Sequence, residues 1–110
     1  MIIDFEKIEE NVVENFKGGN GKLIMRAADD GKVKIMRNIL TPGSSIGMHT
    51  HEGNCEVMYI IKGEITFVCD GKEETVRAGE VHYCPCGHTH CAENRTAEDA
   101  EFFAIVPEMK

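Results

Sequence analysis

Short apolar runs separated by turn signals fill the chain from Gly21 onward, and this pattern restricts the fold more than any other feature. A turn containing Asp30-Gly31 separates "KLIMRAA" from "KVKIMRNIL", and one containing Asp70-Gly71 separates "EITFVC" from "EETVRA". Asp-Gly between two strand-like runs is a hairpin signal. Many short strands at a spacing of roughly ten residues are typical of an antiparallel sandwich or barrel. The sequence therefore predicts an all-β fold.

Alternation within the runs predicts which side chains face the interior. In "EITFVC", Ile65, Phe67 and Cys69 share one face because successive side chains of a strand point to opposite sides. We expect this face to point into the barrel.

The N-terminal segment follows a different period. Apolar residues recur there at helical spacing, namely Phe5, Ile8, Val12 and Phe16. Asp4 is a suitable N-cap, and Gly18-Gly19 provides a stop signal. We therefore expect residues 1–21 to form a short helical or extended segment, packed on a single barrel that spans residues 22–110.

Composition excludes several classes of partner. A chain of 110 residues is long enough for one domain but not for two. Its formal net charge is −7 and it has no block rich in Lys or Arg, which argues against nucleic acid and anionic membranes as partners. The N-terminus carries acidic residues and no long apolar run, so we expect neither a signal peptide nor a membrane span, and a cytoplasmic location.

Histidines and one glutamate in the middle of the chain form a candidate metal site. His49 and His51 are two residues apart, so in an extended segment both imidazoles point the same way. A turn at Gly53-Asn54 would fold the next run, which begins at Glu56, back beside them, while His90 lies in a later segment. Three imidazoles and one carboxylate suit a divalent first-row metal with positions left open for water or substrate.

Two longer patterns contain these four residues. One reads G-x5-H-x-H-x4-E-x6-G from Gly43 to Gly63, and the other reads G-x5-P-x-G-x2-H-x3-N from Gly79 to Asn94. Together they resemble the two motifs of the cupin superfamily, with every motif position filled. The short segment between them, residues 64–78, is similar to that of the minimal microbial cupins.

The resemblance implies both an architecture and a ligand set. The expected fold is a cupin double-stranded β-helix, or jelly-roll barrel, with one divalent transition metal per chain, which in this family is Mn, Fe, Ni, Zn or Cu. Small cupins are typically homodimers, so we expect a homodimer. The implied metal ligands are His49, His51, Glu56 and His90.

The cysteines form a weaker candidate. The chain has five, an odd number that cannot pair completely within one molecule, and in a reducing cytosol we expect free thiols or metal ligands. Cys84 and Cys86 stand closer together than the usual pair of a structural zinc site, and Pro85 between them hinders a loop that wraps an ion. A turn at Pro85 and Gly87 that positions His90 is the preferred interpretation. Whether Cys69, Cys84 or Cys86 lines the pocket stays open.

Two classes of function are compatible with such a site. The first is a small metalloenzyme that acts on an oxygen-bearing small molecule, such as a carboxylate, sugar or diol, as an oxygenase, decarboxylase, isomerase or lyase. The alternative is a non-catalytic module that binds or senses a small molecule through the metal. The sequence leaves the native metal and the substrate open.

Three further residues are candidates for catalysis. His88 could act as an acid or base near the mouth of the site, although a place for His82 and His88 at the surface or rim is the simpler expectation. Arg26 and Arg37 could bind an anionic substrate, although one strand register would turn either side chain outward.

Overall fold

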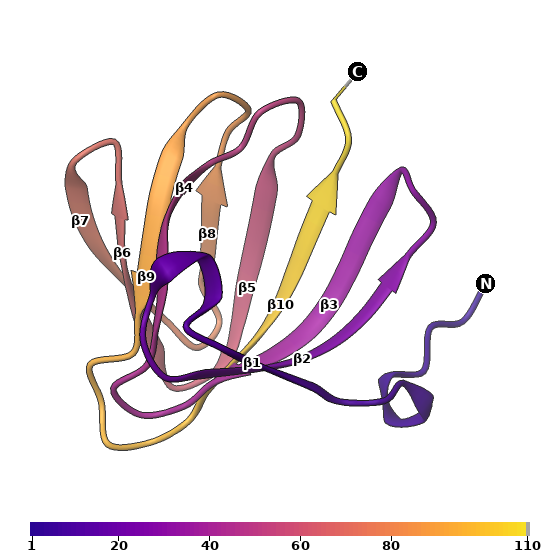
Figure 1. The fold of residues 1–110 in the computed structure, drawn as a ribbon, viewed down its shortest axis with the longest axis horizontal. Helices are drawn as coiled ribbons and strands as arrows, with labels where there is room; N and C mark the ends of the chain where they lie inside the picture. Colours follow the sequence, from indigo (N-terminus) through magenta and orange to yellow (C-terminus); the bar gives the residue numbers. More distant parts are fainter. Residues whose placement is uncertain (110) are drawn as a thin grey trace.

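The computed structural model describes residues 1–109, which form two antiparallel β-sheets that curve around a common interior (Figure 1). The six-stranded sheet contains, in spatial order, β1 (Asn11–Glu14), β2 (Lys22–Asp29), β3 (Val33–Leu40), β10 (Ala100–Pro107), β5 (Glu56–Lys62) and β8 (Val81–Cys84). The four-stranded sheet contains β4 (Ser45–Thr50), β9 (Thr89–Glu93), β6 (Glu64–Cys69) and β7 (Lys72–Arg77). The predicted all-β class is confirmed.

Helical structure in the described residues is limited to two 3₁₀ turns, η1 (Phe5–Lys7) and η2 (Phe16–Gly18). No helix among residues 1–109 has the length and apolar character needed to cross a membrane.

Alternating side chains of both sheets form the core. Ile65 and Phe67 are completely buried, as the alternation of "EITFVC" predicts, whereas Cys69 at the end of that strand is only partly buried. The larger apolar residues of the core are Leu23, Met25, Met36, Leu40, Ile46, Met58, Ile60, Ile65, Phe67, Val76 and Phe102.

Both predicted hairpins are present. Asp70 and Gly71 join β6 to β7 with φ angles of 52° and 80°, the left-handed values that a tight two-residue hairpin requires. The turn between β2 and β3 is held by Asp30, whose carboxylate accepts the backbone N–H groups of Lys32 and Val33 at 2.9 Å. These turns explain why Asp-Gly identifies the hairpins in the sequence.

The N-terminal segment is less helical than its periodicity predicts. Asp4 does cap η1, accepting the backbone N–H of Glu6 at 3.1 Å, but the helix ends after three residues. Residues Asn11–Glu14 instead form β1, which pairs with β2 and places Val12 opposite Ile24. The free edge of β2 offers unpaired backbone groups, and two adjacent β-branched valines favour a strand, so sheet pairing outweighs the helical pattern.

The same segment packs tightly against the strand that carries His49. A β-carbon added to Gly47 would lie 2.0 Å from the carbonyl oxygen of Lys17, and one added to Gly19 would lie 2.2 Å from that of Ser45. Glycine at both positions therefore allows the backbone of residues 17–19 to touch β4 directly. The pairing of β4 with β9 shifts register between Ile46 and His49, next to this contact.

A fully buried asparagine stabilises the base of the barrel. The Nδ2 group of Asn94 donates to the carbonyl oxygens of Leu40 and Glu98, both at 2.8 Å. Its Oδ1 accepts from the backbone N–H and the hydroxyl of Thr96, at 3.0 and 2.7 Å. The side chain thus joins the end of β3 to the loop that precedes β10.

We predict that Asn94→Ala lowers the free energy of unfolding by about 3 kcal/mol, because it leaves several buried polar groups without partners. Urea unfolding followed by circular dichroism measures the change. Asn20→Ala is the control, since Asn20 is exposed, and it should shift stability by less than about 0.5 kcal/mol. Equal effects of the two substitutions would contradict the structural role of Asn94.

Candidate metal centre

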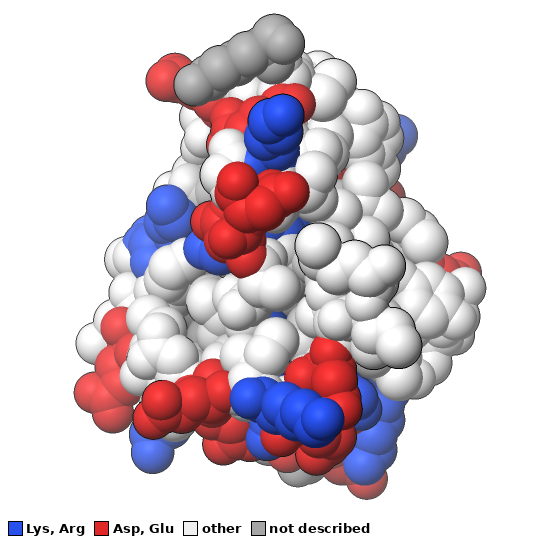
Figure 2. All heavy atoms as spheres, turned by 90° about the vertical axis from the view of Figure 1, so that its right-hand side faces the viewer, with Lys and Arg blue, Asp and Glu red and all other residues white. Residues whose placement is uncertain are grey.

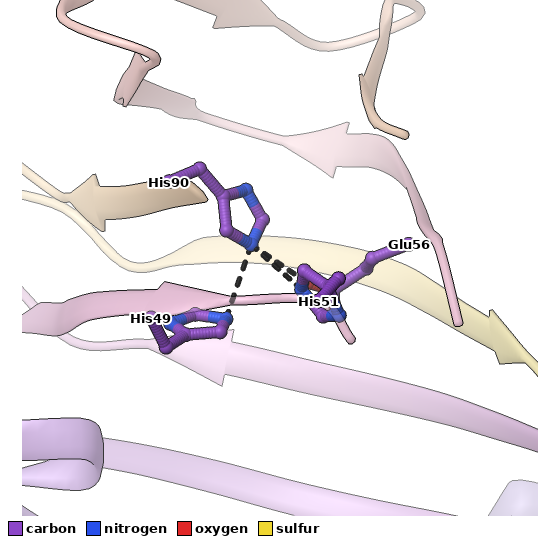
Figure 3. Close-up of side chains that lie close together, drawn as sticks. All are labelled: His49, His51, Glu56 and His90. Carbon is purple, nitrogen blue, oxygen red and sulfur yellow. Dashed lines mark hydrogen bonds and ion pairs between the residues drawn. The ribbon is translucent and has the colours of Figure 1, made fainter. Parts of the chain in front are cut away.

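The four predicted ligands meet between the two sheets. His49 on β4 lies directly opposite His90 on β9, and His51 follows β4 by one residue. Glu56 begins β5 in the other sheet and points toward the three imidazoles (Figure 3). The cluster therefore connects the sheets across the barrel interior.

The donor atoms are close together and largely buried. The Nε2 atom of His90 lies 3.1 Å from Nε2 of His49, 3.0 Å from Nε2 of His51 and 3.1 Å from Oε1 of Glu56. A further 3.1 Å separates Nε2 of His51 from the same carboxylate oxygen. His90, Glu56 and His51 are 1%, 6% and 8% exposed. One donor atom from each residue lies within 4.8 Å of all the others, so the cluster could hold a metal ion.

Hydrogen bonds on the far side of two rings determine what these donors can bind. Nδ1 of His49 lies 2.8 Å from the carbonyl oxygen of Gly47, and Nδ1 of His51 lies 2.8 Å from Oδ1 of Asn54. Both oxygens can only accept, so each Nδ1 carries the hydrogen and each neutral ring directs the bare lone pair of Nε2 into the cluster. Lone pairs that converge beside a carboxylate are satisfied by a cation, and the residues therefore fit a divalent metal.

The electrostatics agree with this arrangement. Burial alone would raise the pKa of Glu56, but in the absence of an ion, protons on His51 and His90 form hydrogen bonds to it that outweigh burial and lower the pKa to about 2, so the carboxylate is charged. Burial lowers the pKa of His49, which keeps its ring neutral. The hydrogen bond to Glu56 raises the pKa of His51, so a proton on that ring competes with a metal ion.

The turn of the second motif binds to the backbone of the first. The N–H of His88 donates to the carbonyl oxygen of Pro85 at 3.1 Å, which closes the predicted turn, and Gly87 within it has a φ of 88°. The N–H of Gly87 then donates to the carbonyl oxygen of His51 at 2.7 Å, and the N–H of His51 donates to that of His88 at 3.0 Å. The turn is thus hydrogen-bonded to the backbone of one candidate ligand, His51. It ends at His88, two residues before another candidate ligand, His90.

A cavity of about 250 Å³ lies beside the cluster. His51 and Glu56 line it, together with an apolar wall that includes Leu23, Met36 and Met58. Asn38 on β3 also lines it; this side chain is 3% exposed, and its Oδ1 has no hydrogen-bond partner among the described residues. Its Nδ2 has only a 3.8 Å contact with Sδ of Met36.

Arg26 and Arg37 do not reach this cavity. They lie opposite each other on β2 and β3, one position out of step with Met36 and Asn38, and so point to the outer face of the sheet. There Arg26 pairs with Glu10 at 2.9 Å, and Arg37 donates to Glu101 at 2.6 Å. The strand register that turns both arginines outward, considered from the sequence, is the one observed. Their positions do not support a catalytic role for either side chain.

His88 is also separate from the cluster. Its side chain is exposed and pairs with the carboxylate of Asp70 on the β6–β7 turn. His88 therefore lies at the surface, as the expectation of a surface or rim position allowed. Its side chain does not line the cavity beside the candidate ligands. His82, expected at the surface or rim, is only 1% exposed, so that expectation was wrong.

None of the five cysteines lines the cavity. Cys84 is buried opposite Glu56 in the β5–β8 pairing, and Cys69 lies opposite His90 in the β6–β9 pairing. Burial raises the pKa of Cys84 to about 12, which keeps this thiol protonated. Cys86 in the turn is exposed. The thiols are thus neighbours of the candidate ligands rather than walls of the pocket.

Asn38 and His82 are the site residues that the sequence reasoning missed. Strand alternation could have found both, because "KIMRNIL" places Met36, Asn38 and Leu40 on one face and "VHYC" places His82 with Cys84. Asn38 stands between the inward-facing Met36 and Leu40, and His82 shares its face with Cys84.

Comparisons with known proteins agree with this fold. The model of the cupin domain family matches residues 36–106. An oxalate-binding protein of Thermotoga maritima is 34% identical over an alignment of 112 residues. The alignment covers 96% of this chain and 93% of that protein.

Solved structures give the same result. The crystal structure of a predicted oxalate decarboxylase from Thermotoga maritima matches with a TM-score of 0.91 at 33% identity, over 98% of this chain and 99% of that one. A sugar phosphate isomerase of the cupin superfamily from Silicibacter pomeroyi shares the fold with a TM-score of 0.79 at 19% identity, over 98% of this chain and 76% of that one. The matched domain, the two sheets and the identity to a full-length relative together show that this chain belongs to the cupin family.

Proposed function

We propose that this protein binds a small carboxylate, such as oxalate, at a divalent metal ion held by His49, His51, Glu56 and His90. The observation that carries the proposal is the position of this cluster beside a small cavity lined by the buried amide of Asn38, whose oxygen has no hydrogen-bond partner among residues 1–109. Four donors leave positions of a first-row metal open toward the cavity.

The spacing of the donors favours a six-coordinate ion. Neighbouring ligands about 2.1 Å from an ion stand about 3.0 Å apart when they meet at right angles and about 3.4 Å apart in a tetrahedron. The four separations given above for the donor atoms of the cluster are 3.0 to 3.1 Å. An ion bound there would act as a Lewis acid toward the oxygens of a ligand.

The cavity favours a small anion. Its volume of about 250 Å³ has room for roughly eight water-sized groups, so the ligand is small. Lys17, Lys32 and Lys34 are among its lining residues and balance the carboxylates of Asp29, Glu56 and Glu108 there, so a bound divalent ion would leave the lining with a net positive charge. The amide of Asn38 can donate to a carboxylate oxygen through Nδ2 and accept from a hydroxyl or water through Oδ1. The name of the Thermotoga maritima relative supports oxalate as the first ligand to test.

Turnover of the same ligand is a second candidate function, favoured by the apolar wall of Leu23, Met25, Met36 and Met58 that shields the cavity from water. Decarboxylation of oxalate would consume one proton and release formate and carbon dioxide. Formate accumulation by the metal-loaded protein, absent from the His49→Ala variant, would establish the enzyme. Tight oxalate binding without formate release would establish the binding module.

The outer face of the six-stranded sheet supports a homodimer. Val57 and Tyr59 on β5 lie between Tyr83 and Val81 on one side and Ile105 and Phe103 on the other, so large apolar side chains continue across three strands. Tyr59, Val81, Tyr83 and Ile105 are 44%, 53%, 53% and 38% exposed. The side of the molecule that lies to the right in Figure 1, where β2, β3 and the N-terminal segment are found, has a broad uncharged area between two groups of charged side chains (Figure 2). We propose that a second copy covers the β5–β8–β10 surface, since contiguous exposed apolar area marks interaction sites.

Metal content tests the first step of the proposal. Wild-type protein purified without added metal should carry about one divalent ion per chain, and His49→Ala should carry far less because one donor is lost. Elemental analysis measures both. His88→Ala is the matched control, a histidine outside the cluster, and should keep the wild-type content. Equal metal in wild type and His49→Ala would exclude the proposed site.

Asn38→Leu should separate ligand binding from stability. Removing a buried amide with an unpaired oxygen should leave the free energy of unfolding unchanged or raise it by about 1 kcal/mol. The same change should weaken oxalate binding to the metal-loaded protein roughly tenfold. Urea unfolding and isothermal titration calorimetry measure the two effects. Met58→Leu is the control, because it keeps the wall apolar and should bind oxalate with wild-type affinity. An unchanged oxalate affinity in Asn38→Leu would rule out a contact between Asn38 and the ligand.

The dimer is tested by charge on its proposed surface. Tyr59→Lys combined with Tyr83→Lys should convert a dimer to a monomer, because like charges would face each other across the interface. Light scattering during size-exclusion chromatography measures the mass. Met48→Lys alters an equally exposed apolar residue on the other sheet and should leave the dimer intact. A monomeric wild type, or a double variant that stays dimeric, would disprove this interface.

A further inference from the structure

A chain of hydrogen bonds connects the candidate ligand His90 to the protein surface. Nδ1 of His90 lies 3.0 Å from Nε2 of His82, and Nδ1 of His82 lies 2.6 Å from Oε1 of Glu74. His82 is fully buried, whereas the side chain of Glu74 is 54% exposed. The three side chains come from β9, β8 and β7, so the chain crosses from one sheet to the other and back.

The direction of every hydrogen in this chain follows from its outer end. The carboxylate of Glu74 can only accept, so Nδ1 of His82 carries the hydrogen. Nε2 of the neutral His82 ring is then bare and accepts from Nδ1 of His90. With its hydrogen on Nδ1, His90 directs the lone pair of Nε2 at His49, His51 and Glu56.

The middle residue of this chain is held rigidly. The ring of His82 stacks on that of Phe67, with centroids 3.7 Å apart and planes 7° apart. Phe67 is itself completely buried. Glu74 lies opposite Phe67 in the β6–β7 pairing, so its side chain is on the inward face of the edge strand, above the stacked rings. Packing thus positions both hydrogen-bonding atoms of His82.

We propose that Glu74 and His82 are positioning residues that select the tautomer of His90, orient its ring and increase electron donation from its Nε2 to a bound metal. The inference rests on metal binding by the four-ligand cluster. A carboxylate that accepts from a histidine hydrogen increases the basicity of the opposite nitrogen, and here the effect passes through a second imidazole. Of the three histidine ligands, His90 is the one whose second nitrogen contacts another ionisable side chain rather than a backbone carbonyl or an amide.

Zn²⁺ affinity, measured by competition with a chromophoric chelator, tests the proposal. Glu74→Gln should weaken Zn²⁺ binding about 10- to 100-fold, since outer partners of ligating histidines have effects of this size. Glu73→Gln removes the same charge from the adjacent residue, whose carboxylate pairs with Arg95 at 2.9 Å. It should bind Zn²⁺ as the wild type does, which separates the hydrogen-bonded chain from the general effect of charge.

His82→Phe distinguishes the chain from simple packing. Phenylalanine can keep the stack on Phe67 but offers His90 no hydrogen-bond acceptor. It should weaken Zn²⁺ binding at least as much as Glu74→Gln does, and adding Glu74→Gln to it should cause no further loss, because residues in series are not additive. The thermal midpoint of metal-free Glu74→Gln should match that of Glu73→Gln.

Long-range ¹H–¹⁵N spectra of the zinc-loaded protein provide an independent measurement. They should show the hydrogen on Nδ1 of both His82 and His90 in the wild type and a shifted His90 resonance in Glu74→Gln. Equal Zn²⁺ affinities of Glu74→Gln and Glu73→Gln, or a His90 hydrogen absent from Nδ1, would overturn the relay alone. A wild type that takes up no Zn²⁺ would overturn the metal site with it, and failure to bind oxalate would count only against the proposed ligand.

Discussion

Imidazole lone pairs that converge beside a charged carboxylate need a cation, and the architecture of this protein is organised around that requirement. The carbonyl oxygen of Gly47 and the amide oxygen of Asn54 hold the hydrogens of His49 and His51 on the outer nitrogens. Each neutral ring therefore directs the lone pair of its Nε2 atom toward the other ligands. Without an ion, protons must fill the same role, which explains why Glu56 raises the pKa of His51.

The elements around the cluster are arranged so that these donors meet. Cross-strand pairing sets His49 against His90, and the turn ending at His88 bonds to the backbone of His51, so both motifs are connected before any ion binds. Contact of the N-terminal segment with Gly47 supports the strand irregularity beside His49. A barrel preorganised in this way would lose little conformational entropy on binding an ion.

Much of this arrangement could be predicted from the sequence, for physical reasons. Asp-Gly turns have few alternative conformations, so the hairpins were predictable, and the resemblance to the two cupin motifs implied the cluster of four ligands. The strand at residues 11–14 was not, because the attraction of an unpaired sheet edge is a tertiary effect. The outward direction of Arg26 depends on a register that local pattern leaves open. The buried position of His82 follows from a partner, Glu74, on another strand.

Strict alternation along β3 also has an evolutionary consequence. Arg37 belongs to the outer face and its neighbour Asn38 to the cavity, although one peptide bond joins them. Substitutions at Lys34, Met36 or Asn38 change the wall of the cavity, and those at Arg37 or Ile39 change the outer face. Relatives with this barrel can therefore diverge in cavity and in outer surface independently, through adjacent codons.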